Sequence, residues 1–125
     1  MQDAAIRNYL DALSRGDLDQ LMALFDPKAT VYSPLYGQQP ARVFYPALLQ
    51  DSAASHIELL QIFQSNSPQY AAVNFLYHWT LANGEEVTFD CVDIFQFDKA
   101  GKITELKIIY DASQTRPALE RTQNS

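Results

Sequence analysis

Two polar residues far apart in the chain have side chains suited to stabilising a developing negative charge. Tyr9 lies where apolar residues recur at helical spacing, and Asp93 interrupts the apolar face of a predicted strand over 86–97. A carboxylate on an apolar face costs roughly several kcal/mol unless it is paired or protonated. A protonated carboxyl beside a tyrosine hydroxyl can donate hydrogen bonds to an enolate oxygen. Each residue is therefore a candidate for an oxyanion-binding site, with structural hydrogen bonding as the alternative.

A proton-transfer site also needs a base, for which His78 is the candidate on the neighbouring predicted strand. The alternative for His78 is a hydrogen-bonded residue of the pocket wall. Cys91 has no basic neighbour in the sequence, so it is expected to be a small core residue rather than a nucleophile. No His, Cys or carboxylate cluster has metal-ligand spacing, and there is no glycine-rich phosphate loop, so we expect neither metal nor cofactor.

The composition is that of one globular domain, 125 residues long with 47% hydrophobic residues. We expect the domain to span residues 1–115 and residues 116–125 to form a flexible tail. The net charge of −6 and the lack of a basic run argue against nucleic acid or a membrane as partner. The single cysteine and the absence of a visible signal peptide favour the cytoplasm.

The elements that position these residues are helices in the first half of the chain and strands in the second half. Apolar residues at i, i+3, i+4 and i+7 predict helices over 6–13 and 18–25. The remaining expected elements are a strand over 30–33, a helix over 42–50, and strands over 56–65, 70–81, 86–97 and 103–111. Helices followed by an antiparallel sheet indicate an α+β fold.

The sequence Asn83-Gly84 predicts a hairpin and therefore a strand register. A two-residue turn places Ala82 opposite Glu85 and, further along, His78 opposite Phe89. Opposed residues share a sheet face. The predicted pocket face thus carries Asn74, Leu76, His78, Phe89, Cys91, Asp93 and Phe95. The other face carries Phe75, Tyr77, Trp79, Val92 and Ile94; because helices can cover only one face of so short a chain, we expect this one to pack on a second copy.

Three segments of the chain, residues 8–19, 24–31 and 92–103, resemble the ketosteroid isomerase and SnoaL-like families of the nuclear-transport-factor-2-like superfamily. The similarity runs from about residue 5 to residue 112. It implies N-terminal helices packed on a curved antiparallel sheet, a cone-shaped barrel with an internal apolar pocket. It also implies a homodimer through the outer face of the sheet.

The resemblance assigns roles to individual residues. Tyr9 and Asp93 match the tyrosine and the protonated aspartic acid that donate hydrogen bonds to a dienolate oxygen in ketosteroid isomerases. The family's general base, an aspartate before a proline, is here Ser33 before Pro34. Loss of a positioned base costs about 100- to 10,000-fold in rate, which argues against ordinary steroid isomerisation. SnoaL-like polyketide cyclases use an acidic residue of the sheet as acid and base, a role open to Asp93.

The sequence therefore favours a protein that binds a small apolar carbonyl compound and catalyses isomerisation, cyclisation or dehydration without a cofactor. Tyr9, Asp93 and His78 are the expected catalytic residues. The expected ligand-binding residues are Ser33, Asn74, Leu76, Phe89, Cys91, Phe95 and Tyr110. The resemblance implies that Tyr110 points inward near Asp93; the alternative is an aromatic residue that only lines the pocket. The alternatives are a non-catalytic binding module and a dimerisation domain with a vestigial pocket.

Overall fold

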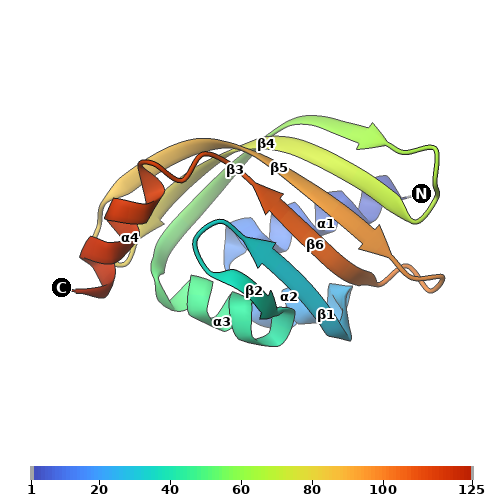
Figure 1. Ribbon diagram of the computed structural model, residues 1–125, viewed down its shortest axis with the longest axis horizontal. Helices are drawn as coiled ribbons and strands as arrows, with labels where there is room; N and C mark the ends of the chain where they lie inside the picture. Colours follow the sequence, from blue (N-terminus) through green and yellow to red (C-terminus); the bar gives the residue numbers. More distant parts are fainter. Residues whose placement is uncertain (1, 125) are drawn as a thin grey trace.

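The computed structural model describes residues 2–124. Helices pack in the concave side of a curved sheet (Figure 1). In chain order the elements are α1 (Gln2–Arg15), α2 (Leu18–Leu24), β1 (Phe25–Ser33), β2 (Gly37–Pro40), α3 (Ala41–Gln50), β3 (Ser52–Gln64), β4 (Tyr70–Leu81), β5 (Glu86–Phe97), β6 (Ile103–Ile109) and α4 (Thr115–Gln123). The predicted α+β class is confirmed. Within the described residues, no helix is long and apolar enough to cross a membrane.

The sheet has six strands in the order β2-β1-β6-β5-β4-β3. Its neighbours are antiparallel except for β1 and β6, which pair in parallel. The sheet is therefore mixed rather than antiparallel throughout, and it stays open instead of closing into a barrel. The parallel pair is possible because the intervening elements provide the long connection that parallel neighbours need. The short edge strand β2 is not among the strands expected from the sequence.

The register of the β4–β5 hairpin differs from the sequence prediction by one residue. The turn has three residues, because Leu81 N–H donates to Glu85 O at 2.8 Å and Gly84 takes a φ of +92°. Tyr77 therefore lies opposite Phe89, and His78 lies opposite Thr88. Since successive strand residues alternate between faces, this single step exchanges the two faces of β4. The predicted assignment of β5 to its faces is unaffected.

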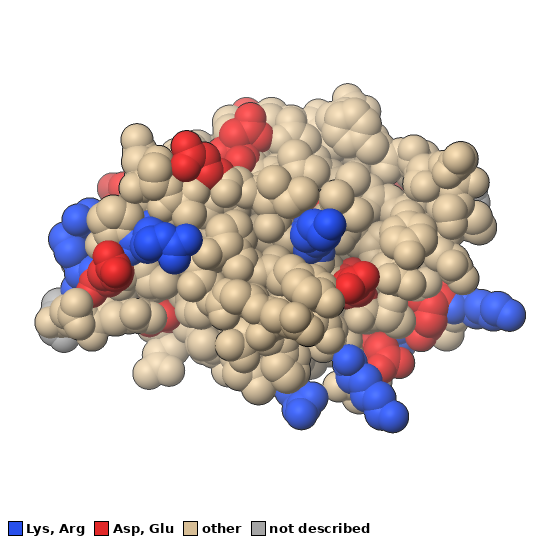
Figure 2. Space-filling model, in the orientation of Figure 1, with Lys and Arg blue, Asp and Glu red and all other residues tan. Residues whose placement is uncertain are grey.

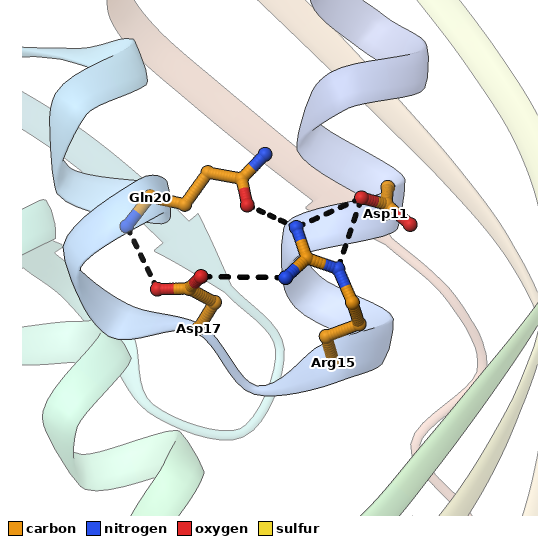
Figure 3. Close-up of polar contacts among 4 residues, drawn as sticks. All are labelled: Asp11, Arg15, Asp17 and Gln20. Carbon is orange, nitrogen blue, oxygen red and sulfur yellow. Dashed lines mark hydrogen bonds and ion pairs between the residues drawn. The ribbon is translucent and has the colours of Figure 1, made fainter.

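Arg15 fixes the junction between α1 and α2 (Figure 3). Its guanidinium pairs with Asp11 one turn earlier at 2.9 Å and with Asp17 at 3.4 Å, and it also donates to the Gln20 side chain. Asp17 caps α2 by accepting a hydrogen bond from the Gln20 N–H at 3.0 Å. Gly16 supports the sharp turn with a φ of +65°. α1, which ends at this junction, packs on β3 and carries Tyr9 into the core.

The C-terminal segment was expected to be a flexible tail, but residues 115–123 form helix α4. Ala118 and Leu119 are buried in the main core, and Pro117 lies in the first turn, where proline is tolerated. Arg121 pairs with Glu85 in the β4–β5 turn. Only two apolar residues anchor this helix, which is too few to produce a visible pattern in a polar segment.

The face of the sheet turned away from α1, called here the outer face, is left without a helix over its central strands. In Figure 1 α1 lies behind the sheet, so Figure 2 views the molecule from this side. Much of the middle of the view is uncharged, and charged side chains are more numerous toward the two ends. Large apolar side chains on this face are exposed, including Phe63 at 52% and Ile109 at 47%.

Candidate functional site

A narrow apolar cavity of about 40 Å³ lies between the helices and the concave face of the sheet. Tyr9 and Leu13 reach it from α1, while Asp93 reaches it from β5. Its lining consists of Tyr9, Leu13, Ser33, Leu35, Tyr36, Phe44, Leu48, Phe75, Tyr77, Trp79, Phe89, Cys91, Asp93, Ile108 and Tyr110. The structure thus brings together Tyr9 and Asp93, two residues that the sequence selected from opposite ends of the chain.

Tyr9 is almost completely buried and forms a hydroxyl pair with Tyr45 of α3. The two hydroxyl oxygens are 2.7 Å apart, and either group can be the donor. When Tyr45 donates, the proton of Tyr9 is free for a ligand in the cavity. Burial, the neighbouring Tyr45 and the charge of Asp93 raise the pKa of Tyr9 well above its ordinary value. Tyr9 therefore stays protonated at neutral pH and acts as a hydrogen-bond donor.

Asp93 has only 1% of its surface exposed, although its side chain is a carboxyl. Desolvation by burial raises its pKa to about 7, while a hydrogen bond from the Cys91 thiol opposes this shift. The Cys91 Sγ lies 3.3 Å from Asp93 Oδ1. Burial also raises the pKa of the Cys91 thiol, so the sulfur remains protonated. A carboxyl with a pKa near neutrality can both donate and accept a proton at physiological pH.

Ser33 lines the cavity as expected, but its side chain already has a structural role. Its Oγ accepts hydrogen bonds from the backbone N–H groups of Leu35 and Tyr36, both at 3.2 Å. These bonds shape the turn between β1 and β2. Ser33 therefore supplies no base, and Asp93 is the cavity group whose pKa lies near neutrality.

The aromatic residues predicted for the site divide into two groups. Phe89 and Tyr110 line the cavity, with ring centroids 4.2 Å apart. Phe95 is fully buried on the same face of β5 but is not part of the lining. Its ring packs edge-on against Tyr9, with centroids 5.3 Å apart. Phe95 thus supports the site through Tyr9 instead of forming the cavity wall.

Three predicted site residues on β4, Asn74, Leu76 and His78, lie on the outer face instead of in the cavity. The one-residue change in hairpin register is the cause. His78 lies 3.6 Å from Glu58 on β3 and 3.0 Å from the Thr88 hydroxyl. It has no access to Asp93 or to a ligand in the cavity, so the prediction of a base at this position is wrong.

The same change brings into the cavity three β4 residues that were expected on the dimer face. Phe75, Tyr77 and Trp79 all line it. Sequence analysis also missed Tyr45 and Tyr36. Tyr45 follows an apolar residue in α3, and its hydroxyl contact with Tyr9 spans 36 residues. The sequence contains no local signal for such a long-range pair.

The described residues, 2–124, contain no group of three or more His, Cys, Asp or Glu side chains that could hold a metal ion.

Comparison with known proteins places this site in a family context. A family model described as a SnoaL-like domain matches residues 6–106. A steroid Δ-isomerase from Nocardioides simplex is 30% identical over 112 residues, which cover 86% of this chain and 87% of that protein. The family-model match contains both Tyr9 and Asp93.

Solved structures show the same fold at lower sequence identity. The epoxide hydrolase/cyclase-like enzyme SalBIII of pyran ring formation superposes with a TM-score of 0.76 at 20% identity, over 89% of this chain and 95% of that one. A Δ5-3-ketosteroid isomerase from Mycobacterium sp. gives a TM-score of 0.71 at 22% identity, over 86% and 91% of the two chains. At these identities the likeness shows the fold alone.

Proposed function

The chain belongs to the SnoaL-like domain family, and from this premise we propose that it catalyses proton transfer on a small apolar carbonyl compound. The reaction is of the isomerase, cyclase or dehydratase type. The main observation in support is the carboxyl group of Asp93, which is 1% exposed in an apolar cavity and has a pKa raised to about 7. A group tuned in this way is typical of an acid–base catalyst.

The proposed step assigns one role to each polar group. The Tyr9 hydroxyl, backed by Tyr45 at 2.7 Å, donates a hydrogen bond to the carbonyl oxygen of the ligand. The ionised Asp93 carboxylate removes a proton from the carbon beside that carbonyl, and the electron pair moves onto the oxygen. The product of this step is an enolate together with neutral Asp93. The same carboxyl group then returns the proton to another carbon.

A non-catalytic binding module is the second candidate, and Ser33 is the observation that favours it. The position that holds a general base in ketosteroid isomerases is here a serine whose Oγ accepts two backbone hydrogen bonds. A protein that binds enol-like or phenolic molecules needs Tyr9 and a protonated Asp93 but no base.

The two candidates are separated by binding and turnover measured on the same protein. A phenolate resembles an enolate, so we expect binding of a nitrophenol, followed by its absorbance, to weaken at least about tenfold in both Tyr9→Phe and Asp93→Asn. Tyr32→Phe and Asp19→Asn serve as matched controls outside the cavity. Turnover is measured as isomerisation of cyclohex-3-enone to its conjugated isomer, with deuterium uptake from D₂O.

Isomerisation or deuterium uptake that is lost in Asp93→Asn supports the enzyme. Phenol binding without either reaction supports the binding module. If nitrophenol does not bind, or binds equally well to all four variants, the assignment of an oxyanion-binding site to Tyr9 and Asp93 is wrong.

A homodimer is proposed as the assembly in which this site operates. The outer face carries exposed Phe63, Tyr70 and Ile109 beside Val92 and Ile94. Phe75, Tyr77 and Trp79, which were expected to belong to this interface, point into the cavity instead. The proposal therefore rests on the remaining apolar residues, which form an exposed patch that a second copy would cover.

A further inference from the structure

Three of the aromatic side chains that line the cavity, Tyr36, Tyr77 and Trp79, are called here the aromatic wall. All three line the cavity, and Trp79 is 2% exposed. The Tyr77 ring also stacks on Phe89 with centroids 5.1 Å apart and an interplanar angle of 15°. Tyr77 also packs edge-on against Trp79, with centroids 6.3 Å apart, while Tyr36 packs edge-on against Phe44 at 5.4 Å. These rings fill space that a large ligand would need.

Hydrogen bonds at the outer ends of these side chains hold the aromatic wall in place. Tyr36 donates its hydroxyl proton to Asp51 at 2.7 Å. The Tyr77 hydroxyl lies 3.0 Å from the Ser55 hydroxyl. Both partners belong to the short segment where α3 ends and β3 begins. Tyr36 and Tyr77 are therefore held by side chains of this segment, and their rings do not rotate freely.

Trp79 has the most constrained position of the three. Its indole Nε1–H donates to Ser52 Oγ at 2.7 Å, and Ser52 in turn donates to the carbonyl of Leu48 in α3 at 2.6 Å. This chain of bonds links the indole to the last turn of a helix. Rotation of Trp79 away from the cavity would leave buried donors and acceptors unpaired, which is costly.

The free space that remains, about 40 Å³, is small. Pockets for drug-sized ligands typically measure about 300–1,000 Å³. A polycyclic ligand would have to displace the aromatic wall and break its hydrogen bonds. A single ring that places its oxygen against Tyr9 and Asp93 requires a much smaller adjustment.

We infer that the site selects single-ring carbonyl or phenolic compounds over polycyclic ones, and that Trp79, held by Ser52, sets this size limit. This inference rests on the proposed function for the role of the ligand oxygen. The selection by size depends on the wall alone and can be measured separately.

The test uses the intrinsic fluorescence of the protein, because Trp79 is the only tryptophan in the chain. The intact protein is titrated with phenol, 2-naphthol and estradiol, and in parallel with the neutral rings benzene and naphthalene. We expect phenol and benzene to quench Trp79 at concentrations at least about tenfold below those of the larger members of each series, corrected for their water-to-octanol partition.

Two variants examine the wall directly, with ligand absorbance or calorimetry as the signal. Trp79→Leu removes the large ring, and Ser52→Ala releases the indole without changing its size. We expect both to strengthen binding of 2-naphthol relative to phenol by about tenfold or more. Val43→Ala, an exposed change in α3, is the control. Circular dichroism establishes whether each variant is folded. If Trp79→Leu does not fold, Ser52→Ala still tests the role of the indole.

The outcomes separate this inference from the proposed function. If estradiol binds the unmodified protein as tightly as phenol after the partition correction, the size limit is wrong while the oxyanion site stands. If the neutral rings follow the expected order but no phenol binds, the size limit stands and the proposed function is wrong. An unchanged preference in both variants would overturn the role of Trp79.

Discussion

At the scale of single residues, Asp93 shows how an apolar environment changes a side chain. Its carboxyl group is surrounded by aromatic and aliphatic residues, and the Cys91 thiol is a weak hydrogen-bond donor. A hydrogen bond from such a weak donor replaces only a small part of the hydration free energy that the charged carboxylate loses on burial. The neutral form is therefore favoured in the folded state, and the pKa rises to about 7.

This shift predicts that Asp93 makes the protein less stable as the pH rises. Between the unfolded pKa near 4 and the folded pKa of about 7, the folded state binds one more proton than the unfolded state. Relative to the fully ionised carboxylate, protonated Asp93 adds about 4 kcal/mol to the free energy of unfolding. This contribution is complete below pH 4 and is lost as the pH rises through 7. Urea unfolding of wild type and Asp93→Asn at several pH values measures it. A difference between the two proteins that does not change with pH would contradict the assignment.

The Tyr9–Tyr45 pair predicts a measurable coupling. Tyr45→Phe leaves the buried Tyr9 hydroxyl without its partner, and loss of a buried partner costs about 1–3 kcal/mol. The variant Tyr9→Phe/Tyr45→Phe removes both hydroxyls, so we expect its loss of stability to be smaller than the sum of the single variants. Additive losses in urea unfolding would show that the two hydroxyls do not interact.

At the scale of elements, the β4–β5 hairpin decides which side chains enter the site. A turn of two residues would direct His78 inward, whereas the observed three-residue turn directs Tyr77 and Trp79 inward. Gly84 makes the longer turn possible through its φ of +92°. The composition of the pocket wall therefore depends on the conformation of one glycine far from Asp93.

Gly84→Ala is expected to destabilise the protein by about 1–2 kcal/mol, the usual cost of a left-handed conformation for a residue with a Cβ. No atom lies within 4 Å of the added methyl group, so the cost is one of backbone conformation and not of collision. Gly84→Asn is the control, since asparagine tolerates this region better. Thermal unfolding measures both. Equal melting temperatures for Gly84→Ala and wild type would contradict the turn assignment.

At the scale of the whole molecule, the open sheet has one face covered by helices and one face with no helix over its central strands. Phe63 and Ile109 are among the most exposed apolar side chains of the described residues. Both lie on the outer face, where the proposed second copy would cover them. An exposed apolar surface of this kind favours association.

The homodimer proposal predicts that Ile109→Glu produces a monomer, because a charged group in an apolar interface is left without hydration or a partner. Sedimentation velocity on wild type and variant measures the change. Val43→Glu adds the same charge at an exposed position of α3 and is expected to leave the assembly unchanged. A wild type that sediments as a monomer at high micromolar concentration would contradict the proposal.

The sequence by itself determined much of this protein because some signals are local. Helical periodicity, the strands over 70–81 and 86–97, and the position of Asp93 in an apolar strand were all visible in the order of residues. The inward placement of Tyr9 followed from helical periodicity, because the apolar face of one helix is recorded directly in the order of residues. Strand alternation put Asp93 on one face of its strand, but both faces of that strand are apolar, and the family resemblance identified the pocket face.

Tertiary structure alone decided the features that depend on contacts between elements. The sequence Ala82-Asn83-Gly84 is compatible with two turn lengths, and packing of Phe75, Tyr77 and Trp79 in the core accompanies the longer one. The Tyr9–Tyr45 pair, the parallel β1–β6 pairing and helix α4 likewise join distant segments. Their stability comes from long-range burial and hydrogen bonding, for which the local order of residues carries no signal.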